Sequence, residues 1–563
     1  LGKSMRKSDT VVSAPEPAGS ASASGALTGT AAVQNAVRQS SADRARTMLR
    51  DFVKAMGVTQ VDTAANGREA LSQLRSHRYN IVICDFNLGQ GQNGQQVLDE
   101  ARMRDYIGVS TIWVMVTAEK TTDMVMGAAE VKPDDYLLKP INQSLLQTRL
   151  EKLIVRKQSL GGIEAAIQAK DFARAVAQCD QQLQGQVANA QEILRIKGDL
   201  LITLGEYEAA QALFASVLAT RSVPWARTGL GKIHYLNGAY AAARDVFQQV
   251  LKENRMFIEA SDWLVKSLSA LGDGAQAQQV LLDAVRLSPN SPARQKALGD
   301  AAYKNGELDI AQAAFEKNIK ISEFSAHKSA AVYAGLARVL TKKDTPDEAL
   351  KVLARSKAAF KDSPEAAIQT AAAESAVYQK MGLPDKAGAA MAQAEQLMAG
   401  LPGKATSETA LEMAQALFAL GRQEQASDLM RDLVKNNHEN VEIARQIEAV
   451  FEGANLGAEG AALIRESRQE VININNEGVV LAKKGEFLEG AKLLRTAVKN
   501  LPNSETVILN LCALLIGLMN KQGQSEDLVQ EVRALLDRVF ILNPANKKYQ
   551  LYAGALARMT NGR

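Results

Sequence analysis

The stretch that decides the fold is residues 81–88, Ile-Val-Ile-Cys-Asp-Phe-Asn-Leu. Four apolar residues in succession, three of them β-branched, predict a strand that is covered on both faces, as in a parallel α/β sheet. Asp85 follows directly and is therefore expected at the carboxyl end of that strand. Because ligands of open parallel sheets gather at this edge, we interpret Asp85 as a reactive carboxylate. The alternative is an acid that only caps the following loop.

Two later apolar runs repeat this pattern, and a helical pattern precedes each of them. The runs are residues 110–116 and 136–138, and the helical patterns are residues 94–103 and 121–131. The first of these runs ends at Thr117 and the second at Lys139. Strands and helices that alternate at this spacing predict a parallel sheet with right-handed crossovers, so Asp85, Thr117 and Lys139 are expected together at one edge.

From residue 44 to residue 156 the sequence resembles the receiver domain of two-component response regulators. In that family an aspartate at the end of the third strand accepts a phosphoryl group, and a Thr or Ser at the end of the fourth bonds the phosphoryl oxygens. A Lys before a cis-proline ends the fifth strand, three positions after an aromatic switch residue. The matching positions are Asp85, Thr117, Lys139, Pro140 and Tyr136.

The resemblance implies a doubly wound α/β domain with a flavodoxin-like, five-stranded parallel sheet. The three roles also make physical sense, because a phosphorylated carboxylate carries about two negative charges and needs a hydroxyl donor and an ammonium nearby. Two of the assignments have plain structural alternatives. Tyr136 is read equally well as a core aromatic residue, and Lys139 as a solvated loop residue.

The family also implies a Mg²⁺ site, which this sequence does not complete. Receivers hold the ion with a pair of acids after the first strand, with the phosphoacceptor Asp85, and with a backbone carbonyl two residues beyond it, here that of Asn87. The ion neutralises charge during phosphoryl transfer. Residues 31–40, Ala-Ala-Val-Gln-Asn-Ala-Val-Arg-Gln-Ser, contain no acid. We therefore expect Mg²⁺ only if the receiver is active, and otherwise no cofactor.

The first strand is atypical for the same reason. Residues 31–37 are the best candidate for this central strand, and residues 10–12 are the other. If residues 31–37 fill the position, Arg38 or Gln39 falls where a metal-binding acid is expected, and one hypothesis is that Arg38 pairs with Asp85 in place of the ion. The alternative is an altered N-terminus, residues 1–40, on an ordinary receiver.

The composition excludes several classes of protein. The 563 residues are 46% hydrophobic, which is enough for several cores. A net charge of +4, from 66 Lys and Arg against 62 Asp and Glu, is too small for a dedicated nucleic-acid binder. Three widely spaced cysteines fit a reducing cytoplasm. No apolar run reaches the roughly 18 residues of a membrane helix, so we expect no membrane insertion. The small net charge likewise leads us to expect no nucleic-acid binding.

From about residue 157 onward the sequence shows helical patterns that repeat at a fixed period. Residues of the first clear copy recur 33 positions later, as Gly198, Gly205 and Phe214 and then Gly231, Gly238 and Phe247. This period resembles the tetratricopeptide repeat, a helix-turn-helix unit of 34 residues. We therefore expect a flexible segment at residues 1–40, a receiver at 41–156, and an all-α superhelix of nine or ten repeats at 157–563.

The concave wall of such a superhelix typically binds an extended peptide or a partner's helix. Five polar residues are candidates for this groove, with solvated helix faces as the alternative: Arg195, Lys232, Asn473, Asn475 and Asn476. No kinase core, phosphatase signature or DNA-binding module follows the receiver, so we expect protein binding as the output and no enzymatic activity.

The sequence thus predicts a response regulator of a two-component phosphorelay, with Asp85 as phosphoacceptor. Its expected partners are a sensor histidine kinase or phosphotransfer protein, and a protein bound in the groove of the repeats. The alternative function is a phosphorylation-independent scaffold, because the acidic pair is absent.

Overall fold

The structure is a computed structural model that describes residues 32–36, 42–108, 111–118, 132–185, 189–401 and 405–560. The chain divides into two compact units, Leu1–Leu298 with Lys317–Lys328, and Gly299–Glu316 with Ser329–Arg563. Three predictions lie outside the described residues: the pairing of Arg38 with Asp85, the alternative strand at 10–12, and the helix at 121–131.

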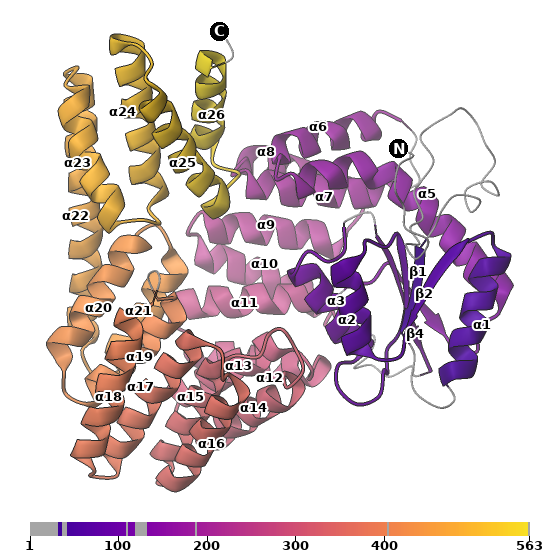
Figure 1. Ribbon diagram of the computed structural model, residues 1–563, viewed down its shortest axis with the longest axis horizontal. Coiled ribbons are helices and arrows are strands. Elements are labelled where there is room, and N and C mark those ends of the chain that lie inside the picture. Colours follow the sequence, from indigo (N-terminus) through magenta and orange to yellow (C-terminus); the bar gives the residue numbers. More distant parts are fainter. Residues whose placement is uncertain are drawn as a thin grey trace. The chain divides into compact units, whose positions relative to one another are not determined.

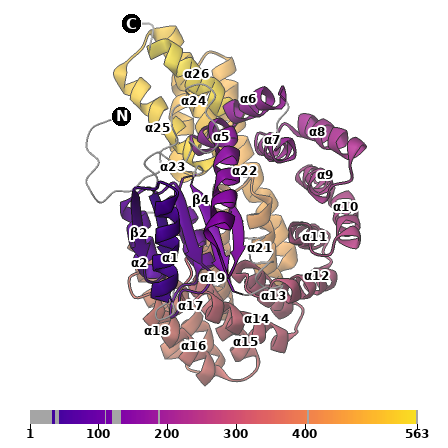
Figure 2. The ribbon, with the colours of Figure 1, turned by 90° about the vertical axis from the view of Figure 1, so that its right-hand side faces the viewer.

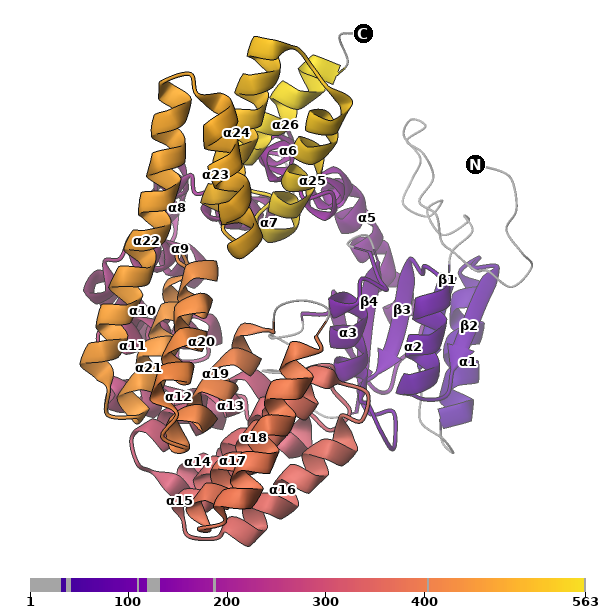
Figure 3. The ribbon, with the colours of Figure 1, turned by 60° about the vertical axis from the view of Figure 1, so that its left-hand side comes forward.

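A five-stranded, wholly parallel sheet forms the core of the N-terminal domain. Its strands are β1 (Ala32–Ala36), β2 (Gln60–Ala64), β3 (Ile81–Asp85), β4 (Ile112–Thr117) and β5 (Asp135–Leu138). The strand order is β2-β1-β3-β4-β5, which Figure 3 shows for the first four of them. The predicted doubly wound sheet is confirmed, and β1, within the weak run predicted at 31–37, lies inside the sheet between β2 and β3.

Helices cover both faces of this sheet. They are α1 (Ala42–Ala55), α2 (Gly67–Ser76), α3 (Gly94–Met103) and α5 (Gln143–Gln168). Ile81 and Ile83 pack with α1 and α5, whereas their neighbours Val82 and Cys84 pack with α2 and α3. Figure 1 shows α1 on one side of the sheet and α2 and α3 on the other. Burial of β3 on both faces follows from its continuous apolar sequence.

Helix α5 is shared by the receiver and the first helical repeat. Leu146, Leu150 and Leu153 in its first half belong to the core of the sheet domain. Leu160 and Ile163 in its second half pack against α6 (Phe172–Leu183). Figure 2 shows this long helix leading directly into the helices that follow. The last receiver helix therefore runs into the first repeat without a linker.

All remaining described elements are helices. In the first unit, and across its boundary with the second, they are α7 (Ala190–Thr203), α8 (Tyr207–Thr220), α9 (Pro224–Leu236), α10 (Tyr240–Glu253), α11 (Ile258–Ala270), α12 (Gly274–Leu287), α13 (Pro292–Lys304) and α14 (Leu308–Ile321). The rest are α15 (Ala330–Lys342), α16 (Pro346–Ala359), α17 (Pro364–Lys380), α18 (Pro384–Ala399), α19 (Ser407–Ala419), α20 (Gln423–Asn436), α21 (Val441–Gly453), α22 (Gly457–Lys483), α23 (Phe487–Asn500), α24 (Glu505–Gln522), α25 (Glu526–Leu542) and α26 (Lys547–Thr560). No helix in the described part of the chain is long and apolar enough to cross a bilayer.

Close helix packing and a left-handed turn explain why glycine and phenylalanine recur every 33 residues. A Cβ added to Gly198 on α7 would lie 2.4 Å from the ring of Phe214 on α8, so only glycine fits there. Gly205, in the turn between these helices, has a φ of 68°, which other residues adopt with strain. Gly231 meets Phe247 in the same way one repeat later.

Two departures from the regular repeat account for the irregular spacing further along the chain. Helices α17 and α18 have 17 and 16 residues, so they are longer than the helices of 13 and 14 residues that precede them. Helix α22 has 27 residues and packs on α21 near its start and on α23 near its end. It therefore serves two successive pairs without a turn, and the count of nine or ten repeats stays a prediction.

The glycine contact can be tested by adding a methyl group. Gly198→Ala should lower the free energy of unfolding by about 1–3 kcal/mol, because the aromatic ring must move to admit it. Gly161→Ala is the matched control: it lies on α5, has no heavy atom within 4 Å of its added Cβ, and should stabilise the chain by up to about 1 kcal/mol. Thermal unfolding followed by circular dichroism measures both. Equal melting temperatures would contradict the steric explanation.

Candidate functional site

The carboxyl ends of β3, β4 and β5 meet at one edge of the sheet. Asp85 is the last residue of β3 and lies level with Val116, so Thr117 extends one position beyond it. The N–H of Lys139 donates to the carbonyl of Thr117 at 2.8 Å, which ties the end of β5 to the end of β4. Asp85, Thr117 and Lys139 are thereby brought to the same edge, as the order of strands and helices predicts.

Both oxygens of the Asp85 carboxylate have partners. Oδ2 forms an ion pair with Nζ of Lys139, and Oδ1 accepts from the N–H of Asn87 at 3.1 Å. The Asp85 side chain is only 6% exposed, whereas that of Lys139 is 35% exposed. The Lys139–Pro140 peptide bond is cis, as the resemblance implied. A nearly buried anion thus faces a cation that reaches solvent.

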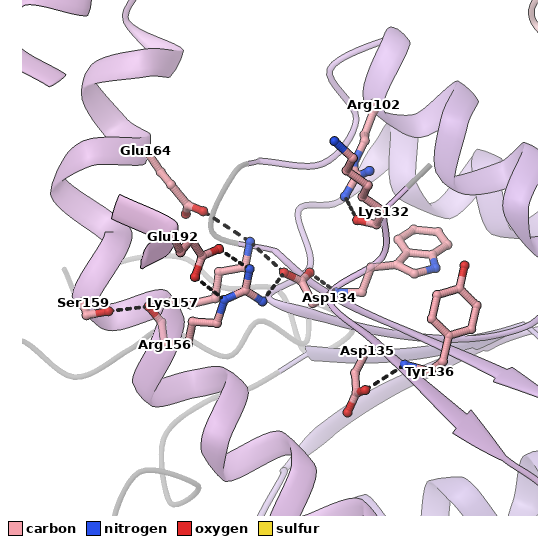
Figure 4. A network of polar contacts seen from close by, with 11 residues as sticks. Arg102, Lys132, Asp134, Asp135, Tyr136, Arg156, Lys157, Ser159, Glu164 and Glu192 are labelled. Carbon is pink, nitrogen blue, oxygen red and sulfur yellow. Dashed lines mark hydrogen bonds and ion pairs between the residues drawn. The ribbon is translucent and has the colours of Figure 1, made fainter. Parts of the chain in front are cut away.

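The two other predicted site residues differ in their surroundings. Thr117 is buried, with 2% of its surface exposed, in the last position of β4. Tyr136 packs against the core between the sheet and the α2–α3 layer, and burial raises the pKa of its phenol. Figure 4 shows its ring on this face. Partial burial is compatible with a core aromatic and with a switch, so the switch role stays a prediction.

The described residues around Asp85 do not by themselves complete a Mg²⁺ site. The ion requires several oxygen ligands in near-octahedral geometry. Both Asp85 oxygens are engaged by Lys139 and Asn87, and no group of three or more metal-ligating side chains occurs within the described ranges. In the sequence, the first acid after β1 is Asp43, the second residue of α1. One carboxylate paired with an ammonium and one carbonyl do not make a site for this ion.

The sequence analysis missed the residues that join Asp85 to α3. A Cβ on Gly94 would lie 2.2 Å from the carbonyl oxygen of Asp85, so this position admits only glycine. Asn93 and Gln96 form a capping box, in which each side chain accepts from the other's backbone N–H. The pattern Asn-x-x-Gln before a helix was the signal that could have predicted it.

A charged network, shown in Figure 4, joins the receiver to the first repeat. Asp134, just before β5, contacts Lys157 at 3.2 Å and Arg156 at 3.7 Å. Arg156 also forms a two-pronged ion pair with Glu192 on α7, and hydrogen bonding to this carboxylate raises the pKa of the guanidinium. Lys157 reaches Glu164 at 3.4 Å, where burial raises the pKa of the Glu164 carboxyl. Sequence analysis did not predict this network.

Two of the predicted groove residues lie together on adjacent first helices. Arg195 on α7 and Lys232 on α9 both pair with Glu259 on α11, at 3.2 and 2.6 Å. Lys232 also lies 3.4 Å from Asp199. Burial alone would raise the pKa of Glu259, but Lys232 and Arg195 hold it below its usual value. The cations expected to bind a partner are therefore balanced by acids of the neighbouring helices.

The other three groove candidates lie on α22 in the second unit. Oδ1 of Asn475 accepts from Nδ2 of Asn510 on α24 at 2.7 Å, which is a contact between neighbouring first helices. Oδ1 of Asn473 accepts from Gln469 of the same helix, and Asn476 is exposed. Their role in binding a partner stays a prediction.

Comparison with known families agrees with this architecture. Residues 42–151 match the family model of the response regulator receiver domain, and residues 197–255 and 264–325 match the tetratricopeptide repeat. The chain therefore carries a response regulator receiver domain followed by tetratricopeptide repeats.

Three curated proteins are similar to the receiver part. The chemotaxis protein CheY of Pseudomonas aeruginosa is 27% identical over 111 residues, which are 20% of this chain and 88% of CheY. The regulatory protein VanRB of Enterococcus faecalis is 32% identical over 101 residues, 18% of this chain and 44% of VanRB. The transcriptional regulatory protein ZraR of Escherichia coli is 27% identical over 126 residues, 22% of this chain and 27% of ZraR. The chain thus spans less than half the length of the latter two.

Solved structures are similar to each part separately. The chemotaxis response regulator CheY4 of Vibrio cholerae is 26% identical, covers 22% of this chain and 98% of its own, and has a TM-score of 0.20. The C-terminal part of a TPR repeat-containing protein from Cytophaga hutchinsonii is 18% identical, covers 43% and 95%, and has a TM-score of 0.33.

Removal of the ammonium tests the Asp85 pairing. Lys139→Met should destabilise the receiver by about 1–3 kcal/mol, because it leaves a buried carboxylate without its cation, a cost reduced by the partial exposure of the lysine. Adding Asp85→Asn should recover most of this loss, since a neutral amide needs no counter-ion. Amide hydrogen exchange of β3 and β4 in the full chain measures the free energies. Equal stability of Lys139→Met and the unaltered chain would contradict the pairing.

Proposed function

We propose that the protein is a response regulator of a two-component phosphorelay whose output is protein binding by the repeats rather than catalysis. The observation that carries this proposal is the Asp85–Lys139 ion pair at the convergence of three strand ends, inside a receiver domain. A buried carboxylate beside an ammonium at a sheet edge is suited to accepting and then stabilising a phosphoryl group.

In the proposed reaction, a carboxylate oxygen of Asp85 attacks the phosphorus of a phosphohistidine on a kinase or phosphotransfer protein. The P–N bond breaks, its electron pair stays on the imidazole nitrogen, and an acyl phosphate forms on Asp85. The Lys139 ammonium then shifts from the carboxylate to the new phosphoryl oxygens, and the Thr117 hydroxyl donates to one of them. These two groups offset the charge that the phosphoryl group adds.

The proposed output is a change in how the repeats present their binding surface. The contacts of Arg156 support this output, because Arg156 joins Asp134, just before β5, to Glu192 on α7. Because α5 is one continuous helix from the receiver core to its contact with α6, a shift at β5 has a rigid route to the repeats. Tyr136, next to Asp135 on β5, is the proposed aromatic switch on that route.

A second candidate function is a phosphorylation-independent scaffold. One observation favours it: residues 32–41 carry no carboxylate, and Lys139 and Asn87 already hold both Asp85 oxygens. In this case Lys139 would keep the domain in one state, and the repeats would bind their partner constantly.

Labelling with radioactive phosphoramidate decides between the two functions. Under the first, Asp85 becomes labelled, Asp85→Asn does not, and chelation by EDTA leaves the rate within about twofold, because the described residues around Asp85 do not complete a Mg²⁺ site. Thr117→Ala should shorten the lifetime of the label, because the acyl phosphate loses a hydrogen-bond donor. If the unaltered chain takes up no label, the phosphorelay function is excluded and the phosphorylation-independent scaffold remains. If EDTA abolishes labelling, the reaction requires a bound metal ion, which would contradict the expected independence of Mg²⁺.

A further inference from the structure

Helix α3 of the receiver touches a segment of the repeats that is far away in the sequence. Oδ2 of Asp99 lies 2.6 Å from Nε2 of His327, and Nε2 of Gln96 donates to the carbonyl of Ile321 at 2.9 Å. Ile321 ends α14, and His327 lies between α14 and α15. Both belong to residues 317–328, which group with the receiver in the first compact unit, although residues 316 and 329 on either side belong to the second.

Gln96 has two tasks at this contact. Its Oε1 accepts from the N–H of Asn93 at 3.0 Å, as part of the capping box that begins α3. Its Nε2 is the donor to Ile321. The first turn of α3 and the contact with the repeats therefore depend on the orientation of the same side chain.

The same turn is tied to the phosphoacceptor. The N–H of Gly94 donates to the carbonyl of Phe86 at 2.8 Å, and the backbone of Gly94 packs against the carbonyl of Asp85. At the other end of this loop, the N–H of Asn87 donates to Oδ1 of Asp85 at 3.1 Å. Loss of that acceptor would release the loop next to the capping box.

A second point of attachment lies at the other end of α3. The guanidinium of Arg102 donates to the carbonyl of Lys132 at 2.9 Å (Figure 4). Burial, and then the charge of Arg195, lower the pKa of the Lys132 ammonium, while Glu259 acts in the opposite direction. The ammonium of Lys132 therefore interacts electrostatically with charged residues of α7 and α11.

We propose that α3 is an internal docking element, which binds the segment 317–328 through Gln96 and Asp99 and transmits a change at Asp85 to it. The docking itself is independent of phosphorylation, whereas its use as a signal rests on the proposed function. The route differs from the one through β5 and Arg156, because it reaches the chain where it passes from the first unit to the second.

The test is amide hydrogen exchange of the full chain, followed by mass spectrometry of peptides from 86–96 and 317–328. Asp99→Lys places an ammonium opposite His327 and should speed exchange in 317–328 about two- to fivefold, the range expected from the loss of one partly exposed ion pair. Asp99→Lys with His327→Glu should restore slow exchange. Asp51→Lys, the same charge change at an exposed site on α1, is the matched control and should have no effect there.

The second arm tests transmission. Asp85→Ala removes the acceptor of the Asn87 N–H and should speed exchange in both 86–96 and 317–328; with Asp99→Lys also present, it should add nothing further in 317–328. Unchanged exchange in 317–328 in Asp99→Lys would overturn the docking. Docking without any response to Asp85→Ala would overturn the transmission. Neither outcome depends on labelling of Asp85, so a failure of the phosphorelay proposal is recognised separately by the phosphoramidate experiment.

Discussion

The charge of Asp85 is the constraint around which the receiver is built. A carboxylate with 6% of its side chain exposed requires compensation, and Lys139 and the Asn87 N–H provide it from two chain segments. Those partners fix the end of β5 and the start of the loop that leads to α3. The same carboxylate therefore sets the positions of the two elements, β5 with α5 and α3, from which contacts with the repeats begin.

Local patterns predicted most of the fold, because they reflect local physics. Continuous apolar runs predicted β3 and β4, and the recurring Gly and Phe predicted the repeats, since each records a requirement within one element or between neighbouring ones. The interior position of β1, between β2 and β3, followed from the strand order of the family, although its Gln34 and Asn35 give it little strand signal.

Contacts between distant segments were not predictable in this way. Gln96 and Ile321 are 225 positions apart, and neither residue type indicates the other. Arg195 and Lys232 were predicted as candidates for the groove. In the structure both form ion pairs with Glu259 on α11. Ion pairing across helices depends on how far successive repeats are rotated, and the sequence period does not contain that angle. Arg195 and Lys232 could be selected as candidates from the sequence, whereas their pairing with Glu259 became visible only in the structure.

Charge compensation also explains why a receiver without the acidic pair can keep its fold. Each added carboxylate near Asp85 would raise the local negative charge and would itself need a cation. With no acid between residues 32 and 41, the single ammonium of Lys139 balances the single carboxylate of Asp85. An acyl phosphate on Asp85 would replace one negative charge by about two, so the ammonium of Lys139 alone would no longer balance the site. The loop from Asn87 to Gly94 begins with the N–H that binds the carboxylate, so phosphorylation of Asp85 would change the contacts of this loop first.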